Sequence, residues 1–185
     1  MMVEIRHRFM VFSCLYFLMS TPLLGAELAR APVKETPATR SPLAEATERF
    51  WREVDCLARN VYWEAVADGE EGQRAVAAVT LNRVATPGFP DTICGVVNQG
   101  APRGQVREDW PQTCQFSWRC TGRAHRRPPE GAAWEQALAV ALEAILSPEE
   151  NTLDGALYFH AVYVRPKWSH RLNYVGRIGG HLFYR

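Results

Sequence analysis

Residues 61–73, VYWEAVADGEEGQ, place a single glutamate, Glu64, where one predicted helix gives way to the next. Upstream of it, apolar residues recur at three- and four-residue steps and predict a helix over residues 43–66. Glu64 follows Val61 by three residues, so its side chain lies at the edge of the apolar stripe. A carboxyl in such surroundings can keep its proton near neutral pH, which makes Glu64 a candidate general acid. The stripe consists of Phe50, Val54, Leu57, Val61 and Ala65.

Two more helices are expected further along the chain. Gly69 favours a turn after the first helix, and a second helix is predicted over residues 71–84. Residues 91–130 are rich in Gly, Pro, Asn and Arg and read as loops. A third helix is predicted over residues 131–146, between prolines on both sides. Its expected buried face is Trp134, Leu138, Ala141, Leu142 and Ile145.

The last part of the sequence predicts short strands. Residues 155–164 alternate and are rich in Tyr, Phe and Val, which is typical of a strand. Residues 174–184 predict a pair of short strands around Gly179 and Gly180. The order of helices, loops, helix and strands predicts an α+β domain with a mainly helical core, a small antiparallel sheet and long loops that wall a cleft.

The N-terminal residues are expected to lie outside this domain. Residues 1–26 combine a basic start, an apolar run and small residues at the end, which predicts a secretory signal peptide; an uncleaved membrane anchor is the alternative. Residues 27–43 are rich in Ala, Pro and Thr and predict a flexible linker. The domain then covers residues 44–185, and we expect an exported protein that can associate with the envelope or a membrane through its N-terminal segment.

Four cysteines remain after the predicted leader: Cys56, Cys94, Cys114 and Cys120. An even number of cysteines in an exported chain indicates two disulfides, with three pairings open. The short segment between Cys114 and Cys120 can close on itself, which would leave Cys56 with Cys94. The spacing lacks the paired knuckles of a zinc site, and no metal or other cofactor is expected.

The charge distribution bears on partners. The net charge is +1, and together with export this argues against nucleic acid. A local basic cluster consists of Arg119, Arg123, Arg126 and Arg127. We expect a monomer whose basic wall faces an anionic extracellular polymer.

Aromatic and polar side chains suited to sugars recur in the second half of the sequence. Sugar rings are bound by aromatic faces together with amide and hydroxyl groups. A Tyr-Phe-His strand more often belongs to the core than to a binding site. The prediction of a sugar site therefore requires these residues to lie near Glu64 in the fold. The predicted substrate-binding residues are Gln115, Phe116, Ser117, Tyr158, His160, Trp168, His181 and Tyr184.

Several blocks resemble the SleB/CwlJ-type cell wall hydrolases in the same order. The resemblance covers roughly residues 56–185. It implies a lysozyme-like fold related to lytic transglycosylase domains. It also implies cleavage between N-acetylmuramic acid and N-acetylglucosamine, with Glu64 as the catalytic glutamate and peptidoglycan glycan strands as substrate. The blocks include Tyr62-x-Glu64-Ala65, Leu81-Asn82-Arg83-Val84, Gln115-Phe116-Ser117, Ala156-Leu157-Tyr158-Phe159-His160 and Ile178-Gly179-x-His181-x-Phe183-Tyr184-Arg185.

The sequence departs from the family pattern directly after the glutamate. The family often reads Glu-Ala-Arg-Gly-Glu-Pro, whereas residues 64–69 here read Glu-Ala-Val-Ala-Asp-Gly, so the arginine is missing. No peptidoglycan-binding repeat is recognisable before the domain, which favours an envelope role in the periplasm of a Gram-negative bacterium over a role in spores.

The expected mechanism uses one carboxyl. Two-carboxylate glycosidases need a partner acid about 5 to 9.5 Å away, and no clear partner is evident, since Asp68, Glu70 and Glu71 read as turn and helix-start acids. Lytic transglycosylase chemistry, which yields 1,6-anhydromuropeptides, is therefore favoured. The alternatives are a muramidase-type hydrolase, a zinc amidase acting on stem peptides through His160, His170, His181 and Glu64, and a non-catalytic glycan-binding module.

Overall fold

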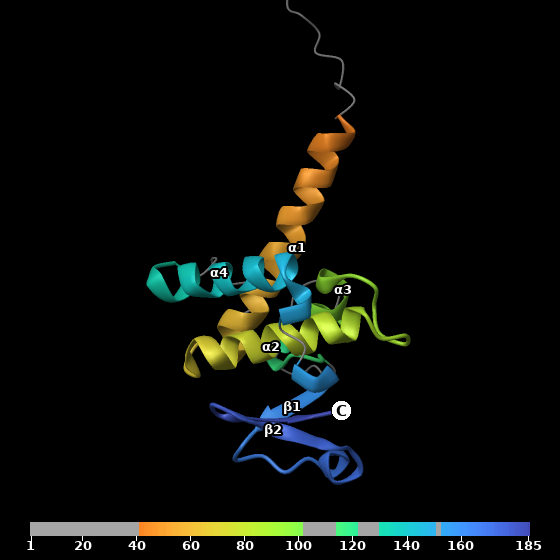
Figure 1. The fold of residues 1–185 in the computed structure, drawn as a ribbon, viewed down its shortest axis with the longest axis vertical. Coiled ribbons are helices and arrows are strands. Elements are labelled where there is room, and N and C mark those ends of the chain that lie inside the picture. Colours follow the sequence, from red (N-terminus) through yellow and green to blue (C-terminus); the bar gives the residue numbers. More distant parts are fainter. Residues whose placement is uncertain (1–40, 102–113, 122–129, 151–152) are drawn as a thin grey trace, which may run out of the picture. The chain divides into compact units, whose positions relative to one another are not determined.

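The computed structural model describes residues 41–101, 114–121, 130–150 and 153–185, drawn in colour in Figure 1. The predicted signal peptide and nearly all of the predicted linker lie outside these residues, as do Arg123, Arg126 and Arg127 of the basic cluster. Among the described helices, none is both long and apolar enough to cross a bilayer.

Helix α1 spans Pro42–Ala65 and confirms the first predicted helix. Ser41 caps its start by accepting a hydrogen bond from the Ala44 amide at 3.2 Å, and Pro42 suits the first turn because no helical N–H bond is needed there. The last two residues assigned to the linker are therefore helical. The first two turns are exposed and extend beyond the other helices (Figure 1), whereas the predicted stripe from Val54 to Ala65 is buried.

Helices α2 (Gly69–Val84) and α4 (Ala132–Leu146) pack against α1. Helix α2 begins two residues earlier than predicted, and Gly69 adopts the positive φ of 68° that the predicted turn requires. The predicted face of α4 was only partly right. Its most buried residues are small, because small side chains allow the closest approach to α1 and α2, while the larger Trp134, Leu138 and Ile145 pack around that contact. The buried set is Ala137, Val140, Ala141 and Ala144.

The region predicted as loops contains two short helical segments, α3 (Ile93–Val97) and the 3₁₀ turn η1 (Ser117–Cys120). Thr92 caps α3 by accepting a hydrogen bond from the Gly95 amide at 3.1 Å. Both segments are tied down by disulfides. Cys56 pairs with Cys94 and joins α3 to α1, and Cys114 pairs with Cys120 across η1.

Three short strands form one antiparallel sheet in the order β1-β3-β2: β1 (Tyr158–Ala161), β2 (Tyr174–Ile178) and β3 (His181–Tyr184). The strand pair around Gly179 and Gly180 is confirmed. β1 is shorter than the predicted strand because the chain turns after Ala161, where the Val164 amide donates to the Ala161 carbonyl. Further 3₁₀ turns are η3 (Pro148–Glu150), η4 (Leu153–Gly155) and η5 (Lys167–Arg171).

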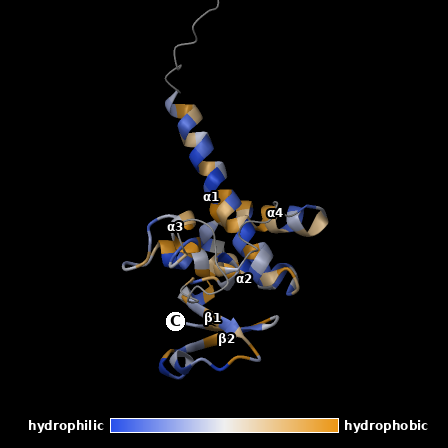
Figure 2. Cartoon of the chain, turned by 180° about the vertical axis from the view of Figure 1, so that it is seen from behind, coloured by the Kyte–Doolittle hydropathy of each residue, from blue (hydrophilic) through white to orange (hydrophobic). Residues whose placement is uncertain are grey.

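The core lies between the helices, and the sheet lies beside α2. In Figure 2 the hydrophobic residues concentrate where α1 meets the other helices. A smaller cluster joins α2 to the sheet through Ala75, Val79 and Phe183. The predicted fold class, a mainly helical α+β domain with a small antiparallel sheet, is confirmed.

Candidate functional site

Glu64 lies in the last turn of α1, half-buried, on the wall of a pocket of about 400 Å³. The neighbouring Val61 and Ala65 point into the core, so the helix holds Glu64 at the edge of the apolar stripe, as the sequence predicts. Among the described lining residues Glu64 is the single carboxylic acid. The pocket is lined by Trp63, Glu64, Arg83, Gln115, Phe116, Ser117, Phe159, His160, Ala161, Tyr163 and His181.

Asp68 ties the end of α1 to the sheet. Its Oδ1 accepts a hydrogen bond from the Gly180 amide at 2.9 Å, and its Oδ2 lies 2.7 Å from Nδ1 of His181. The backbone must come close for this contact: a Cβ on Gly179 would lie 2.8 Å from the Asp68 side chain. Asp68 is therefore a structural brace that fixes His181 at the pocket. Val66, in the segment that departs from the family pattern, is 43% exposed and points away from the core.

Arg83 is a buried cation between Glu64 and the sheet. Its side chain is 1% exposed, its Nε donates to the Leu157 carbonyl at 2.7 Å, and Gln115, with its amide oxygen turned toward Arg83, accepts from both terminal nitrogens at 3.2 Å. Burial lowers the pKa of Arg83 to about 10, and the negative charge of Glu64 acts in the opposite direction. The guanidinium therefore stays charged at neutral pH and lies within electrostatic reach of Glu64.

Aromatic rings surround this cation. The Arg83 guanidinium lies 5.3 to 5.8 Å from the ring centres of Phe89, Phe116 and Tyr158. Cation–π attraction at such distances partly offsets the loss of hydration. The rings and the hydrogen bonds hold the charge in one place, since the guanidinium is enclosed from several sides.

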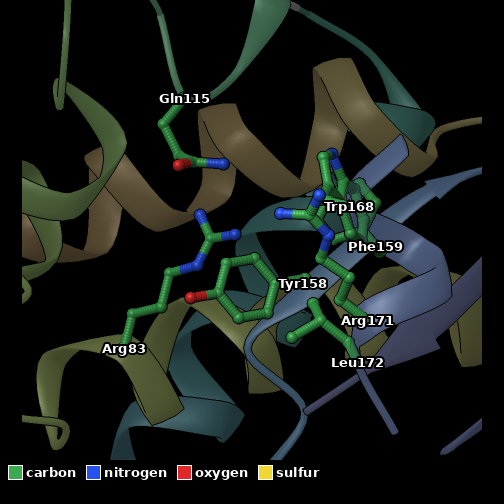
Figure 3. A pocket seen from close by; sticks show the side chains of 7 residues that line it. All are labelled: Arg83, Gln115, Tyr158, Phe159, Trp168, Arg171 and Leu172. Atoms are coloured by element: carbon green, nitrogen blue, oxygen red, sulfur yellow. The ribbon is translucent and has the colours of Figure 1, made fainter. Parts of the chain in front are cut away.

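A second pocket of about 440 Å³ adjoins the first and shares Arg83, Gln115 and Phe159 with it. Figure 3 shows the Arg83 guanidinium pointing between the Gln115 amide and the Tyr158 ring, with Trp168 and Arg171 across the pocket. Together the two pockets form one cleft with an acid at one end and an aromatic wall at the other. Flat apolar rings beside amide and cationic groups suit a sugar polymer.

A second contact network, made by His160, Trp168 and Tyr184, supports the aromatic wall formed by Tyr158 and Trp168. His160 Nε2 lies 3.1 Å from the Tyr184 hydroxyl, and the two rings stack with their centroids 5.3 Å apart. Trp168 contacts the edges of both rings, at 5.5 and 5.6 Å. Tyr184 thus supports His160 and Trp168 and does not line either pocket.

The structure brings together most of the predicted substrate-binding residues. Five of them share the Glu64 pocket: Gln115, Phe116, Ser117, His160 and His181. Tyr158 and Trp168 line the adjoining one. Arg83 was not predicted as a site residue. The sequence did hold a signal, because Arg83 follows Val76 by seven residues and so lies on the same buried side of α2. A charge in that position is costly unless a partner or a function accounts for it.

The residues described do not bring together three or more His, Cys, Asp or Glu side chains that would hold a metal ion. His160 and His181 instead bond to Tyr184 and Asp68. The geometry therefore gives no support to the zinc amidase alternative.

Comparison with solved structures finds the same fold in two bacterial proteins. The catalytic domain of the germination-specific lytic transglycosylase SleB from Bacillus anthracis aligns with a TM-score of 0.55 and 27% identity, over 81% of this chain and 100% of that domain. The catalytic domain of Bacillus cereus SleB aligns with a TM-score of 0.55 and 28% identity, over 73% and 91%. The lysozyme-like, SleB-type fold expected from the sequence is confirmed.

Sequence comparison gives the same relatives. The profile of the family described as Cell Wall Hydrolase matches residues 67–184, a segment that begins three residues after Glu64. The spore cortex-lytic enzyme of Bacillus subtilis (strain 168) is 30% identical over 131 residues, 71% of this chain and 37% of the relative. That of Oceanobacillus iheyensis is 29% identical over 137 residues, 71% of this chain and 41% of the relative. The chain thus spans about two fifths of the length of these curated relatives.

Proposed function

Because the chain belongs to the cell wall hydrolase family, we propose that it cleaves peptidoglycan glycan strands between N-acetylmuramic acid and N-acetylglucosamine. The observation that carries the proposal is the position of Glu64, a lone acid among the described residues of a cleft with an aromatic wall. The proposed reaction is that of a lytic transglycosylase.

In this reaction Glu64 acts twice. Its carboxylic acid first donates a proton to the glycosidic oxygen as the bond to C1 of the muramyl residue breaks. The resulting carboxylate then accepts the proton of the muramyl 6-hydroxyl as that oxygen bonds to C1 and closes the 1,6-anhydro ring. No water is consumed, and Glu64 returns to its starting form. General acid–base catalysis of this kind contributes on the order of 10²–10⁴ in rate.

Arg83 gives this cycle an electrostatic partner. Glu64 favours the charged form of Arg83, and the attraction is mutual, so the guanidinium stabilises the carboxylate formed when Glu64 releases its proton. Arg83 is a positioning residue in this proposal. It holds Gln115 and the start of β1 in place and adds a positive charge beside the acid.

The experiment is digestion of purified sacculi by the wild type and by Glu64→Gln, with mass spectrometry of the products. The glutamine variant should retain the fold and glycan binding but release no anhydromuropeptides. Glu71→Gln, which changes an exposed acid in the first turn of α2, is the matched control and should keep its activity. Anhydro-product release by Glu64→Gln would remove Glu64 from its role. Reducing ends from the wild type would instead indicate a muramidase, and freed stem peptides an amidase.

We also propose that the protein acts outside the cytoplasm as a monomer, with its N-terminal segment directing export or holding it at a membrane. The two disulfides support export, because such bonds persist in oxidising compartments. The finer prediction, the periplasm of a Gram-negative bacterium, is proposed from the sequence alone, since the relatives above come from Bacillus and Oceanobacillus. Cell fractionation and light scattering of the purified protein test location and oligomeric state.

A further inference from the structure

A smaller pocket of about 240 Å³ lies beside the Glu64 pocket and is built on the same two elements. Helix α1 contributes Arg59 to it, four residues before Trp63 of the Glu64 pocket, so the two side chains are neighbours on one face of the helix. The turn η1 contributes Ser117 to the Glu64 pocket and the next two residues to the smaller one. A ligand bound across Glu64 can therefore extend into it. Its lining is Asp55, Cys56, Arg59, Val97, Asn98, Trp118 and Arg119.

Arg119 places a guanidinium group in this pocket. Its guanidinium lies 5.1 Å from the centre of the Trp118 ring. Its Nε is buried and has no hydrogen-bond partner among the described residues, and none of the described acids forms an ion pair with it. A partly buried guanidinium has lost part of its hydration, and a carboxylate paired with it would offset that loss.

The other charges of the pocket leave a deficit of negative charge. Arg59 Nε donates to Asp55 Oδ2 at 2.7 Å, so the Asp55 carboxylate is already engaged. Burial, together with the charge of Arg59, lowers the pKa of Arg119. The Asn98 amide donates to the Cys94 carbonyl at 2.7 Å. Among the described lining residues, two guanidinium groups thus face one pocket that holds a single carboxylate.

A disulfide and two hydrogen bonds hold part of the pocket wall in place. The Cys114–Cys120 disulfide closes the loop that carries Trp118 and Arg119. The Trp118 Nε1 donates to Asn60 Oδ1 at 3.0 Å, and the Asn60 amide donates to Thr80 at 3.1 Å, which fixes the indole to α1 and α2. The guanidinium that stacks on this indole is therefore held in advance of binding.

We propose that this pocket is a subsite for a carboxylate of the peptide that peptidoglycan carries on its muramyl residues, with Arg119 as the anion-binding group and Arg59 as a second cation. The proposal rests on the proposed function, because it takes the glycan bound at Glu64 as the molecule that brings the carboxylate. An uncharged sugar would leave the Arg119 guanidinium without a counter-charge, whereas a peptide carboxylate beside the glycan would supply one.

The test compares two substrates: intact sacculi, and the same glycan strands freed of peptides by an amidase. Arg119→Gln should lower kcat/KM on intact sacculi about tenfold and change it less than twofold on the stripped strands. Arg119→Lys, which keeps the charge, should recover part of the loss. Arg49→Gln, an exposed arginine ten residues before Arg59 on α1, is the control and should match the wild type on both substrates.

Binding separates this proposal from the catalytic one. In the Glu64→Gln background, calorimetry with a disaccharide-tetrapeptide should show an affinity about tenfold weaker when Arg119 is also changed to Gln, and no change with the peptide-free disaccharide. Equal losses on both ligands, or no loss on either, would overturn the subsite. If the wild type cleaved neither substrate but the binding difference persisted, the catalytic proposal would fail and the subsite would stand.

Discussion

Replacing Arg83 by methionine separates the effect of this buried cation on stability from its effect on Glu64. Methionine has a similar length and no charge, so it fills the space while removing the guanidinium. We expect a variant that folds nearly as well as the wild type and is a poor enzyme.

The stability estimate balances two contributions. A pKa lowered from 12.5 to about 10 corresponds to about 3 kcal/mol against the charged form. This cost is fully present at neutral pH, because the group remains charged, and it is relieved only as the pH rises above about 10. Methionine removes the cost but also removes a charge-assisted hydrogen bond to Leu157, about 1.5–3 kcal/mol, and the cation–π contacts. The longer bonds to the exposed Gln115 are lost too and add little, because water can replace them. The free energy of unfolding should therefore change by less than about 2 kcal/mol.

The effect on activity should be larger. Removing one preorganised charge or donor from an active site costs on the order of 10²–10³ in kcat. The pH profile should change as well. Without the cation the carboxylate of Glu64 is less favoured, so its acid form persists to higher pH. The alkaline limb of kcat/KM should move upward, because activity requires the protonated acid in the free enzyme.

Two measurements test this: urea denaturation, and the rate of anhydromuropeptide release from about pH 4 to about pH 9. Arg74→Met is the matched control. Arg74 lies on the same helix but bonds to Glu70 and Glu143 in ion pairs that are partly exposed, and such surface pairs are worth about 0–1 kcal/mol. Wild-type activity with an unchanged pH profile in Arg83→Met would show that Arg83 is only structural. Failure of the variant to fold would show that the stability balance is wrong.

Two other features give sharp expectations. Gly179→Ala should destabilise the fold by about 1–3 kcal/mol in urea denaturation and lower activity, since Gly179 has a φ of 54° and a Cβ there would strike Asp68. Gly176→Ala is the control, because no atom lies within 4 Å of the added Cβ. Equal losses of stability in the two variants would contradict the role of Asp68 as a brace. Removing the Cys56–Cys94 disulfide, which spans 38 residues, should cost about 4 kcal/mol, and removing Cys114–Cys120, which spans 6, about 2 kcal/mol. Loss of the Cys114–Cys120 disulfide should nevertheless reduce sacculus clearance more, because its loop carries Gln115, Phe116 and Ser117. A larger loss of activity on removing Cys56–Cys94 would refute this expectation.

The local features of the fold were predictable. The stripe of α1 and the turn at Gly69 follow from periodicity and backbone preference, so the edge position of Glu64 could be predicted from the sequence. Helix α3 could not be predicted, because its five residues are too few to show a helical period of apolar residues. The segment is instead held by the Thr92 cap and by a disulfide. The face of α4 was misassigned because hydrophobicity favours large residues, whereas close helix packing selects small ones.

The missing parts of the site depend on contacts between distant residues. Asp68 lies next to an expected turn, but its partner His181 is 113 residues away, and a spacing of that length leaves no local signal. Arg83 belongs to helix α2, whose middle is buried on most sides, but only the surrounding rings of Phe116 and Tyr158 show why a cation lies there. Composition alone places such an arginine at the surface.

The strand order has a consequence for the timing of folding. β3 follows β1 and β2 along the chain, yet it lies between them and pairs with both. During synthesis or export the first two strands therefore have no partner in this sheet until β3 emerges. His181, which closes one side of the Glu64 pocket, arrives with that strand. A chain that emerges gradually thus completes its cleft only once residues 181–184 have emerged, after the helical core has had time to form.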